Sequence, residues 1–195
     1  MRFRIFDGME AMSEEQMETE ISMLAGWRKE KALRYKFLID RFLCAKAYLL
    51  LKQLLMEEYG IDCDPSFGYV ANHKPVLLEY PEIQFNFSHC RKGILCVLDS
   101  RAVGCDIEEI PSRLDPELYR YCFNDMETER ILSSEEPGVE FAKLWTMKEA
   151  LLKMTGEGLR DDIKNLLQET DREDIGFQTV PATEKGYVYT ICRRL

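Results

Sequence analysis

The sequence predicts an α+β fold arranged as two successive blocks, and three observations lead to this class. The chain has 195 residues, of which 46% are hydrophobic and 31% charged, the usual balance of a globular protein with a sizeable core. Apolar residues recur at helical spacing in some segments and alternate with polar residues in others. Pro111 separates a first block of helices followed by strands from a second block with the same order, although no residue-level repeat relates the two.

Helices are expected first. Ser13 and Gln16 have the spacing of a capping box, which predicts a helix that begins directly after Ser13 and ends near Gly26. A long helix is expected from about Phe37 to Tyr59, because apolar residues recur there at helical spacing and Gly60 suits its C-terminal stop. The apolar stripe of this helix is assigned to the core.

Strands follow in the first block. Short strands are expected at 67–70 and 76–78, and a third at 83–87, where polar and apolar residues alternate. The turn residues 99–101 lie between two β-branched runs and predict a hairpin that joins the strands on either side.

The second block repeats the order. Asp115 before Pro116, and Asn124 three residues before Glu127, are typical of capped helix starts. A longer helix is expected from Pro137 to about Thr155 and a short one at 162–168. The last strands are expected at 176–180 and 186–192.

The end of the predicted hairpin carries two carboxylates. Residues two apart on a strand point to the same face, so Asp106 and Glu108 project together while Ile107 points the other way. Neighbouring carboxylates repel each other unless they are exposed or joined by a cation. Mg²⁺ prefers such oxygen ligands together with substrate phosphates. The alternative interpretation is a solvated strand end.

A second cluster lies on the helix predicted at 137–155. Residues four apart share a helix face, so Trp145, Glu149 and Lys153 form one column. Taken alone, the Glu–Lys pair is typical of a surface brace. Combined with Asp106 and Glu108, it completes a set suited to chemistry on a phosphorylated substrate: carboxylates for a metal and a base, and a cation for the leaving group.

Charge excludes some functions and suggests others. The net charge of −9 disfavours nucleic-acid binding, which requires excess Lys and Arg. Residues 28–46 nevertheless hold seven bases and two acids, which indicates a bound anion or, alternatively, a helix with a solvated basic face. No apolar run approaches the length of a membrane span, and no signal peptide is recognisable at the N-terminus. The seven scattered cysteines favour a reducing compartment, so a cytoplasmic protein is expected.

Five motifs in order give the chain a resemblance to the 4′-phosphopantetheinyl transferases, specifically the longer, surfactin-synthetase-activating type. Members of that family carry Lys-Pro, Phe-Asn-x-Ser-His, Gly-x-Asp-x-Glu, Trp-x-x-Lys-Glu-x-x-x-Lys and Gly-x-Gly-Leu. The matching segments here are Lys74–Pro75, Phe85–His89, Gly104–Glu108, Trp145–Lys153 and Gly156–Leu159. Phe123 and Glu127 also follow the family's pattern.

The resemblance implies a pseudo-dimer of two similar α/β subdomains, an N-terminal half at 1–110 and a C-terminal half at 111–195, with the active site at their interface. It implies a holo-[acyl-carrier-protein] synthase type of reaction. The 4′-phosphopantetheine arm of coenzyme A is transferred to a serine of an acyl or peptidyl carrier protein, with Mg²⁺ as cofactor, releasing adenosine 3′,5′-bisphosphate. A monomer is expected, with no nucleic acid or membrane as partner.

The resemblance also assigns roles to individual residues. It implies that Asp106, Glu108 and Glu149 hold Mg²⁺, that Glu149 takes the proton of the carrier serine, and that Lys153 stabilises the departing phosphate. The residues that it implies for coenzyme A binding are Arg28, Lys31, Lys74, Ser88, His89, Asp106 and Lys153. A catalytically idle paralogue that binds coenzyme A or carrier protein is the alternative function. An unrelated Mg²⁺ phosphohydrolase is a third.

Overall fold

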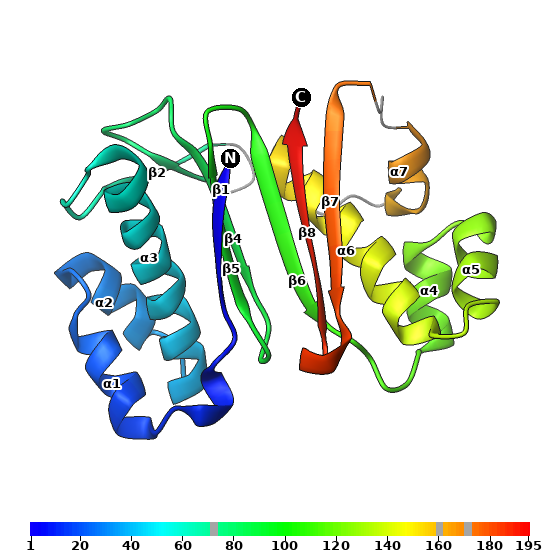
Figure 1. Ribbon diagram of the computed structural model, residues 1–195, viewed down its shortest axis with the longest axis horizontal. Helices are drawn as coiled ribbons and strands as arrows, with labels where there is room; N and C mark the ends of the chain where they lie inside the picture. The colour runs from blue at the N-terminus through cyan, green and yellow to red at the C-terminus, as the bar shows by residue number, and fades with distance from the viewer. Residues whose placement is uncertain (71–73, 159–161, 170–172) are drawn as a thin grey trace.

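The computed structural model describes residues 1–70, 74–158, 162–169 and 173–195. Two three-stranded antiparallel sheets stand at the centre. In chain order, the first is made of residues 2–6, 84–89 and 94–99, with 94–99 as its middle strand, and the second of residues 103–109, 175–182 and 187–194, with 187–194 as its middle strand. The helices between residues 14 and 59 cover one side of the molecule and those between 116 and 169 the other, so the α+β fold class is confirmed (Figure 1).

The first half contains the expected helices with one difference. Both bonds of the Ser13–Gln16 capping box are present, but the helix ends at Ser22 and a separate helix covers the start of the basic segment. The long helix ends at Gly60, whose φ of 68° is the left-handed conformation that glycine adopts easily. The elements are β1 (Arg2–Phe6), η1 (Met9–Ala11), α1 (Glu14–Ser22), α2 (Gly26–Leu33), α3 (Leu38–Tyr59), β2 (Phe67–Tyr69), β3 (Pro75–Leu77), β4 (Gln84–His89) and β5 (Ile94–Asp99).

The second half follows the sequence pattern closely. Asp115 and Asn124 cap their helices through their side chains, as the spacing predicted. The elements are β6 (Val103–Glu109), α4 (Pro116–Cys122), α5 (Asp125–Leu132), α6 (Pro137–Thr155), η3 (Ile163–Asn165), α7 (Leu166–Glu169), β7 (Ile175–Ala182), η4 (Thr183–Lys185) and β8 (Tyr187–Arg194).

The prediction of a hairpin around the turn at 99–101 is wrong. Strand β5 pairs with β1 on one side and β4 on the other, so both of its hydrogen-bonding edges are occupied. Strand β6 pairs instead with β8, from Val103 opposite Arg193 to Glu109 opposite Tyr187. A strand has only two edges, and β1, which the sequence analysis did not identify, occupies the one that the hairpin required.

The turn at 99–102 therefore carries the chain from one sheet to the other. The division expected from the sequence, at residue 110, assigns β6 to the first half. Because β6 pairs along its whole length with β8, we propose that the two halves meet at the 99–102 turn.

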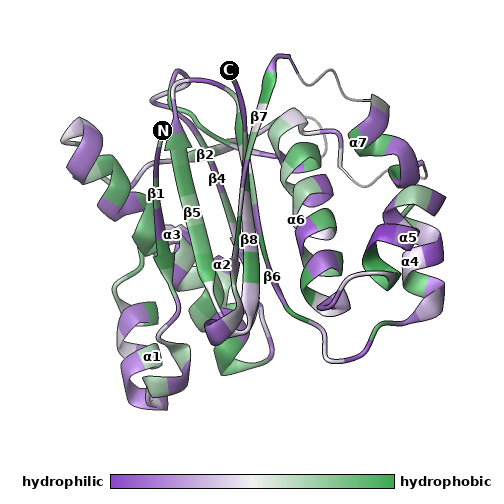
Figure 2. Ribbon diagram, turned by 45° about the vertical axis from the view of Figure 1, so that its right-hand side comes forward, coloured by the Kyte–Doolittle hydropathy of each residue, from purple (hydrophilic) through white to green (hydrophobic). Residues whose placement is uncertain are grey.

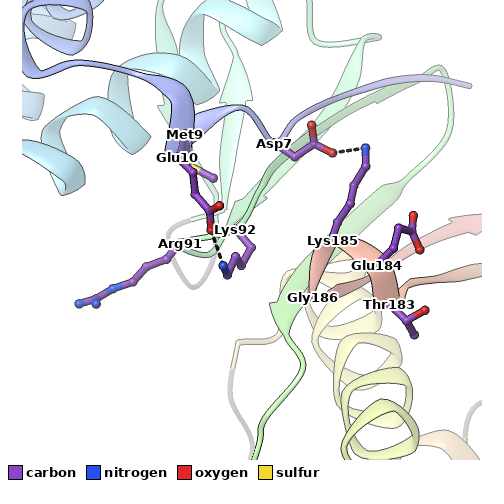
Figure 3. Close-up of a pocket in the computed structure, with 9 residues that line it drawn as sticks. All are labelled: Asp7, Met9, Glu10, Arg91, Lys92, Thr183, Glu184, Lys185 and Gly186. Carbon is purple, nitrogen blue, oxygen red and sulfur yellow. Dashed lines mark hydrogen bonds and ion pairs between the residues drawn. The ribbon is translucent and has the colours of Figure 1, made fainter.

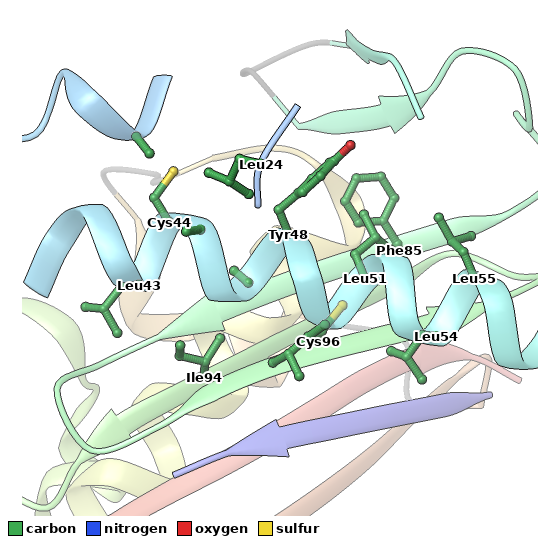
Figure 4. Close-up of a cluster of buried hydrophobic side chains, with 14 of the residues drawn as sticks. Leu24, Leu43, Cys44, Tyr48, Leu51, Leu54, Leu55, Phe85, Ile94 and Cys96 are labelled. Carbon is green, nitrogen blue, oxygen red and sulfur yellow. The ribbon is translucent and has the colours of Figure 1, made fainter. Parts of the chain in front are cut away.

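The core has layers on both faces of the first sheet. Helix α3 packs on one face, where Leu51, Phe85 and Cys96 belong to one buried cluster (Figure 4). On the opposite face, Leu95 and Val97 of β5 pack against residues of β6 and β8. Burial on both faces explains why β5 is a continuous apolar run and not an alternating one. Figure 2 shows β5 in green along most of its length, as expected for a strand whose two faces are both buried.

Candidate active site

The structure brings the two carboxylate motifs into one cavity of about 340 Å³. Strand β4, strand β6 and helix α6 each contribute two or three of its side chains. The lining residues are Phe87, Ser88, His89, Asp106, Glu108, Trp145, Glu149 and Lys153. The Trp145 column on α6 therefore faces the carboxylates of β6, and the surface-brace interpretation of Glu149 and Lys153 does not describe their position.

Gly104 explains how β6 comes so close to α6. A Cβ atom at this position would lie 2.2 Å from the carbonyl oxygen of Ala150 and 2.3 Å from the backbone nitrogen of Met154. Only glycine permits this approach. The first residue of the Gly-x-Asp-x-Glu motif thus sets the distance between the strand that carries Asp106 and Glu108 and the helix that carries Glu149 and Lys153.

Asp106 is the centre of a buried hydrogen-bond network. Its side chain accepts at Oδ1 from the Lys153 ammonium at 2.5 Å and from the Ser88 hydroxyl at 2.7 Å. Lys153 Nζ also donates to Ser88 Oγ at 3.0 Å. Asp106 is 1% exposed, yet its second oxygen, Oδ2, has no hydrogen-bond partner among the described residues. An unsatisfied buried carboxylate oxygen is costly unless another ligand occupies it.

Glu108 and Glu149 are held in an unfavourable environment for negative charge. Burial and the nearby Asp106 charge raise the pKa of Glu108 to about 7, although the Trp145 side chain hydrogen bonds to this carboxylate. Burial and Asp106 also raise the pKa of Glu149, while Lys153 acts in the opposite direction. Two carboxyl groups with raised pKa values beside a buried carboxylate form a site that a cation would stabilise.

The donor set fits a hard divalent cation. All three carboxylates offer oxygen atoms, and the unpartnered Oδ2 of Asp106 is available as a ligand. Within the described ranges, however, no group of three or more His, Cys, Asp or Glu side chains is placed so that it could hold a metal ion as the side chains stand. Asp106 instead shares its charge with Lys153.

The two basic residues of the cavity, Lys153 and His89, differ in protonation. Burial opposes the charge on Lys153, but the Asp106 carboxylate outweighs it and raises the pKa of the ammonium. Desolvation of the ring and the Lys153 charge lower the pKa of the His89 imidazole, although the residue as a whole is exposed at the end of β4. At neutral pH the cavity therefore holds one fixed cation and one imidazole that titrates below its usual range.

The other predicted coenzyme-binding residues lie outside this cavity. Arg28 is 1% exposed, lies over the rings of Tyr48, Phe67 and Phe87, and leaves Nε and Nη1 without a hydrogen-bond partner in the described part of the chain. Lys31, one turn further along α2, contacts Tyr69.

Lys74 lies at the C-terminal end of α6. Its ammonium donates to the backbone carbonyls of Met154 at 2.7 Å and Val103 at 3.5 Å, and burial lowers its pKa. A cation at a helix C-terminus is stabilised by the helix dipole. Lys74 directly precedes β3, so its hydrogen bonds connect the start of that strand to the end of α6. Of the neighbouring Gly156–Leu159 motif, Leu159 lies outside the described residues.

Sequence reasoning missed Lys148, the neighbour of Glu149. Its ammonium is 0% exposed and donates to Glu127 Oε2 at 2.7 Å and to the carbonyls of Cys122, Ile163 and Lys164. These bonds join α6 to α5 and to residues 163–164, and so help to fix the position of Glu149, which lies about 100° further around the helix. The sequence did contain a signal for this pair. Lys148 lies among apolar residues of its helix, and Glu127 lies in the first turn of a capped helix, so both charges were candidates for burial against each other.

A larger cavity of about 460 Å³ lies where the N-terminal segment meets η4 (Figure 3). Its lysines are already neutralised: Lys185 pairs with Asp7 at 2.6 Å and Lys92 pairs with Glu10 at 2.5 Å. Exposed pairs of this kind contribute little to stability and leave little net charge for a ligand. The smaller cavity with its buried carboxylates is therefore the stronger candidate for the site of chemistry.

One buried and two half-buried carboxylates beside a lysine, on a strand and a helix that face each other, are residues suited to group transfer on a phosphorylated substrate. Comparison with known proteins gives the same class. Residues 102–192 match the family model of the 4′-phosphopantetheinyl transferase superfamily. The chain is 31% identical over 181 residues to the 4′-phosphopantetheinyl transferase psf-1 of Bacillus pumilus, covering 86% of this chain and 77% of the relative.

Two further relatives carry the same description. The 4′-phosphopantetheinyl transferase Sfp of Bacillus subtilis is 28% identical over 151 residues, covering 76% of this chain and 67% of Sfp. HetI of Nostoc is 28% identical over 177 residues, covering 87% and 75%. The chain belongs to the 4′-phosphopantetheinyl transferase superfamily and is a transferase of the Sfp type. Among the helices of the described residues, none has the length and hydrophobicity needed to cross a bilayer.

Proposed function

We propose that this protein transfers the 4′-phosphopantetheine arm of coenzyme A to a serine of an acyl or peptidyl carrier protein, in a Mg²⁺-dependent reaction that releases adenosine 3′,5′-bisphosphate. The observation that carries the proposal is the convergence of Asp106, Glu108, Glu149 and Lys153 on one cavity. A catalytically idle relative would have no need for a base and an acid on facing elements. All the charged groups that the transfer requires are present here.

Glu149 is the proposed general base. A serine hydroxyl is a weak nucleophile until a base removes its proton during attack. The raised pKa of Glu149 makes it a better proton acceptor than an ordinary surface glutamate, while the nearby Lys153 favours the ionised form. The serine oxygen forms a bond to the phosphorus that bears pantetheine, and the serine proton passes to the Glu149 carboxylate, directly or through a water.

Lys153 is the proposed partner of the leaving group. The bond from the attacked phosphorus to the bridging oxygen breaks, and its electron pair remains on adenosine 3′,5′-bisphosphate. A positioned ammonium stabilises the charge that grows there. The raised pKa of Lys153 keeps it charged at neutral pH.

The remaining proposed contacts bind coenzyme A and the metal. Asp106, Glu108 and Glu149 would hold Mg²⁺, which supplies Lewis-acid stabilisation of the diphosphate when bound. We propose that His89, Arg28 and Lys31 contact phosphates, and that Lys74 approaches the coenzyme from the end of α6. The Nε and Nη1 atoms of Arg28 have no hydrogen-bond partner among the described residues, but the side chain is 1% exposed and would have to become accessible before it could reach a phosphate. We further propose that the protein is cytoplasmic, since all seven cysteines are free thiols, and that it is a monomer, since two similar halves within one chain leave little need for a dimer.

The experiment is to incubate the protein with coenzyme A, Mg²⁺ and an apo carrier protein and to weigh the carrier by mass spectrometry. The proposal predicts a gain of one phosphopantetheine group, abolished by a chelator. Binding of coenzyme A without modification of any of several fatty-acid and peptide carriers would instead support the idle relative.

A further inference from the structure

The guanidinium of Arg28 is enclosed although two of its nitrogen atoms have nothing to bind. Its Nη2 donates to the carbonyl of Cys44 at 3.0 Å, while Nε and Nη1 have no hydrogen-bond partner among the described residues. The rings of Tyr48, Phe67 and Phe87 lie 5.3, 5.7 and 5.8 Å from its central carbon, and the residue is 1% exposed. Ring faces offset part of the cost of burying a cation, but they do not replace the missing hydrogen bonds. The surroundings of Arg28 therefore form an anion site that is closed.

Of the three rings, Phe67 lies on the element that can move at least cost. Tyr48 belongs to the long helix α3, and Phe87 belongs to β4, which pairs with β5 along its whole length. Phe67 begins β2, and β2 and β3 form a two-stranded sheet of their own, from Phe67 opposite Leu77 to Tyr69 opposite Pro75. A two-stranded sheet is by itself only marginally stable. The β2–β3 hairpin, described at residues 67–70 and 74–77, is thus the part of the enclosure most easily opened.

The same hairpin holds the other two cations proposed to bind coenzyme A outside the carboxylate cavity. Lys31 donates to the Tyr69 hydroxyl at 3.4 Å and lies 5.7 Å from the centre of its ring. Lys74, which directly precedes β3, donates to the carbonyls of Met154 and Val103. A bound phosphate would have to replace these contacts, and each of them involves a residue of the hairpin. One movement of the hairpin would therefore release all three cations.

The closed site adjoins the carboxylate cavity. Phe87 lines that cavity, and its ring also faces the Arg28 guanidinium. A single side chain thus separates the two, so a ligand that carries more than one phosphate could reach both once Arg28 is uncovered.

We infer that the β2–β3 hairpin is a lid, which covers Arg28 in the free protein and opens, with Phe67 leaving the guanidinium, when coenzyme A binds. This inference rests on the proposed function. The form that binds coenzyme A is then a minor population of the free protein, and the apparent affinity is reduced by the fraction of molecules that are open.

The test measures how fast and how tightly coenzyme A binds. Stopped-flow mixing with excess coenzyme A is followed by tryptophan fluorescence, because the ring of Trp27 packs against Phe67 at a centroid distance of 5.3 Å. Calorimetry gives the Kd. The variant Phe67→Leu keeps an apolar side chain but removes the ring from Arg28. Phe3→Leu is the matched control, since it makes the same exchange at a ring that contacts Tyr189 of β8. Circular dichroism checks that both variants are folded.

We expect the wild-type binding rate to reach a plateau as the coenzyme A concentration rises, because opening of the lid then limits it. Phe67→Leu should raise this plateau about 3- to 30-fold, the range expected for loss of one cation–π contact from the closed form. Its Kd for coenzyme A should fall by up to the same factor, because a larger fraction of the protein is open. Phe3→Leu should bind like the wild type.

A wild-type rate that rises linearly to the highest coenzyme A concentration would overturn the inference, and this result requires no variant. Unchanged or weaker binding by Phe67→Leu would also contradict it, since weaker binding would make Phe67 a contact of coenzyme A and not its obstacle. Equal effects of Phe67→Leu and Phe3→Leu would show general loosening of the fold and no specific lid. A wild type that binds no coenzyme A in calorimetry would refute the proposed function itself, and that outcome is recognised before any variant is compared.

Discussion

Raising the pH should destabilise the metal-free protein through Glu108. The folded-state pKa of this carboxyl is about 7, above its usual value of 4.5. The folded protein therefore binds more protons than the unfolded chain between these pH values, and stability falls as pH rises through them. From pH 5 to pH 8 the change is about 2.5 kcal/mol at most, since water at the cavity mouth screens the charges. In a chain of this size that corresponds to about 5–10 °C in Tm.

The assay is thermal or urea unfolding at pH 5 to 8 in the presence of chelator, for wild type and Glu108→Gln. The glutamine variant cannot ionise at this position, so its stability should decline less over the same range. Adding Mg²⁺ should recover stability chiefly at high pH, because a cation favours the ionised carboxylates. Parallel pH profiles for the two proteins, or a wild type that gains stability toward pH 8 relative to the variant, would refute the reasoning.

Three further outcomes follow from single positions. Glu149→Gln should lower the transfer rate about 10²- to 10⁴-fold while coenzyme A binding, measured by calorimetry, is kept, because a general base contributes in that range; an unchanged rate would exclude this role. Gly104→Ala should cost at least about 1–3 kcal/mol in urea unfolding, since the new methyl group would overlap the α6 backbone; wild-type stability would contradict the close packing. Lys148→Met should cost about 3–5 kcal/mol by leaving Glu127 buried and unpaired. The double variant with Glu127→Gln should recover part of that loss, and strict additivity of the two changes would show that the pair is not coupled.

The sequence predicted most helix ends correctly, because a helix end is determined by residues within one or two turns of it. The capping residues Ser13 and Asn124, and Gly60 after α3, act within a few residues of the helix end that they determine. The shared face of Asp106 and Glu108 likewise follows from the strand period alone. These features require no knowledge of the rest of the chain.

The errors concern partners that are distant in sequence. The predicted hairpin failed because β5 pairs with β1, whose residues are more than 85 positions away in the chain. The position of Lys74 depends on where α6 ends, and the buried state of Arg28 depends on aromatic rings from α3, β2 and β4. Spacing along the chain cannot show which carbonyls or rings will surround a long cationic side chain.

Contacts between distant residues were also not predictable within the site. The motifs predicted which residue types come together, but not that Ser88 donates to Asp106 or that the buried Lys148 pairs with Glu127. Each of these bonds joins elements that the sequence order alone does not place side by side.

The central claim is that the cavity between β4, β6 and α6 is where phosphopantetheine is transferred. The most direct measurement is single-turnover transfer from coenzyme A to an apo carrier protein, followed by intact-mass spectrometry, with wild type and Glu149→Gln at saturating coenzyme A and Mg²⁺. The account predicts rapid loading by the wild type and a rate reduced at least about 100-fold in the variant, despite normal coenzyme A binding. Equal loading by both proteins would contradict it.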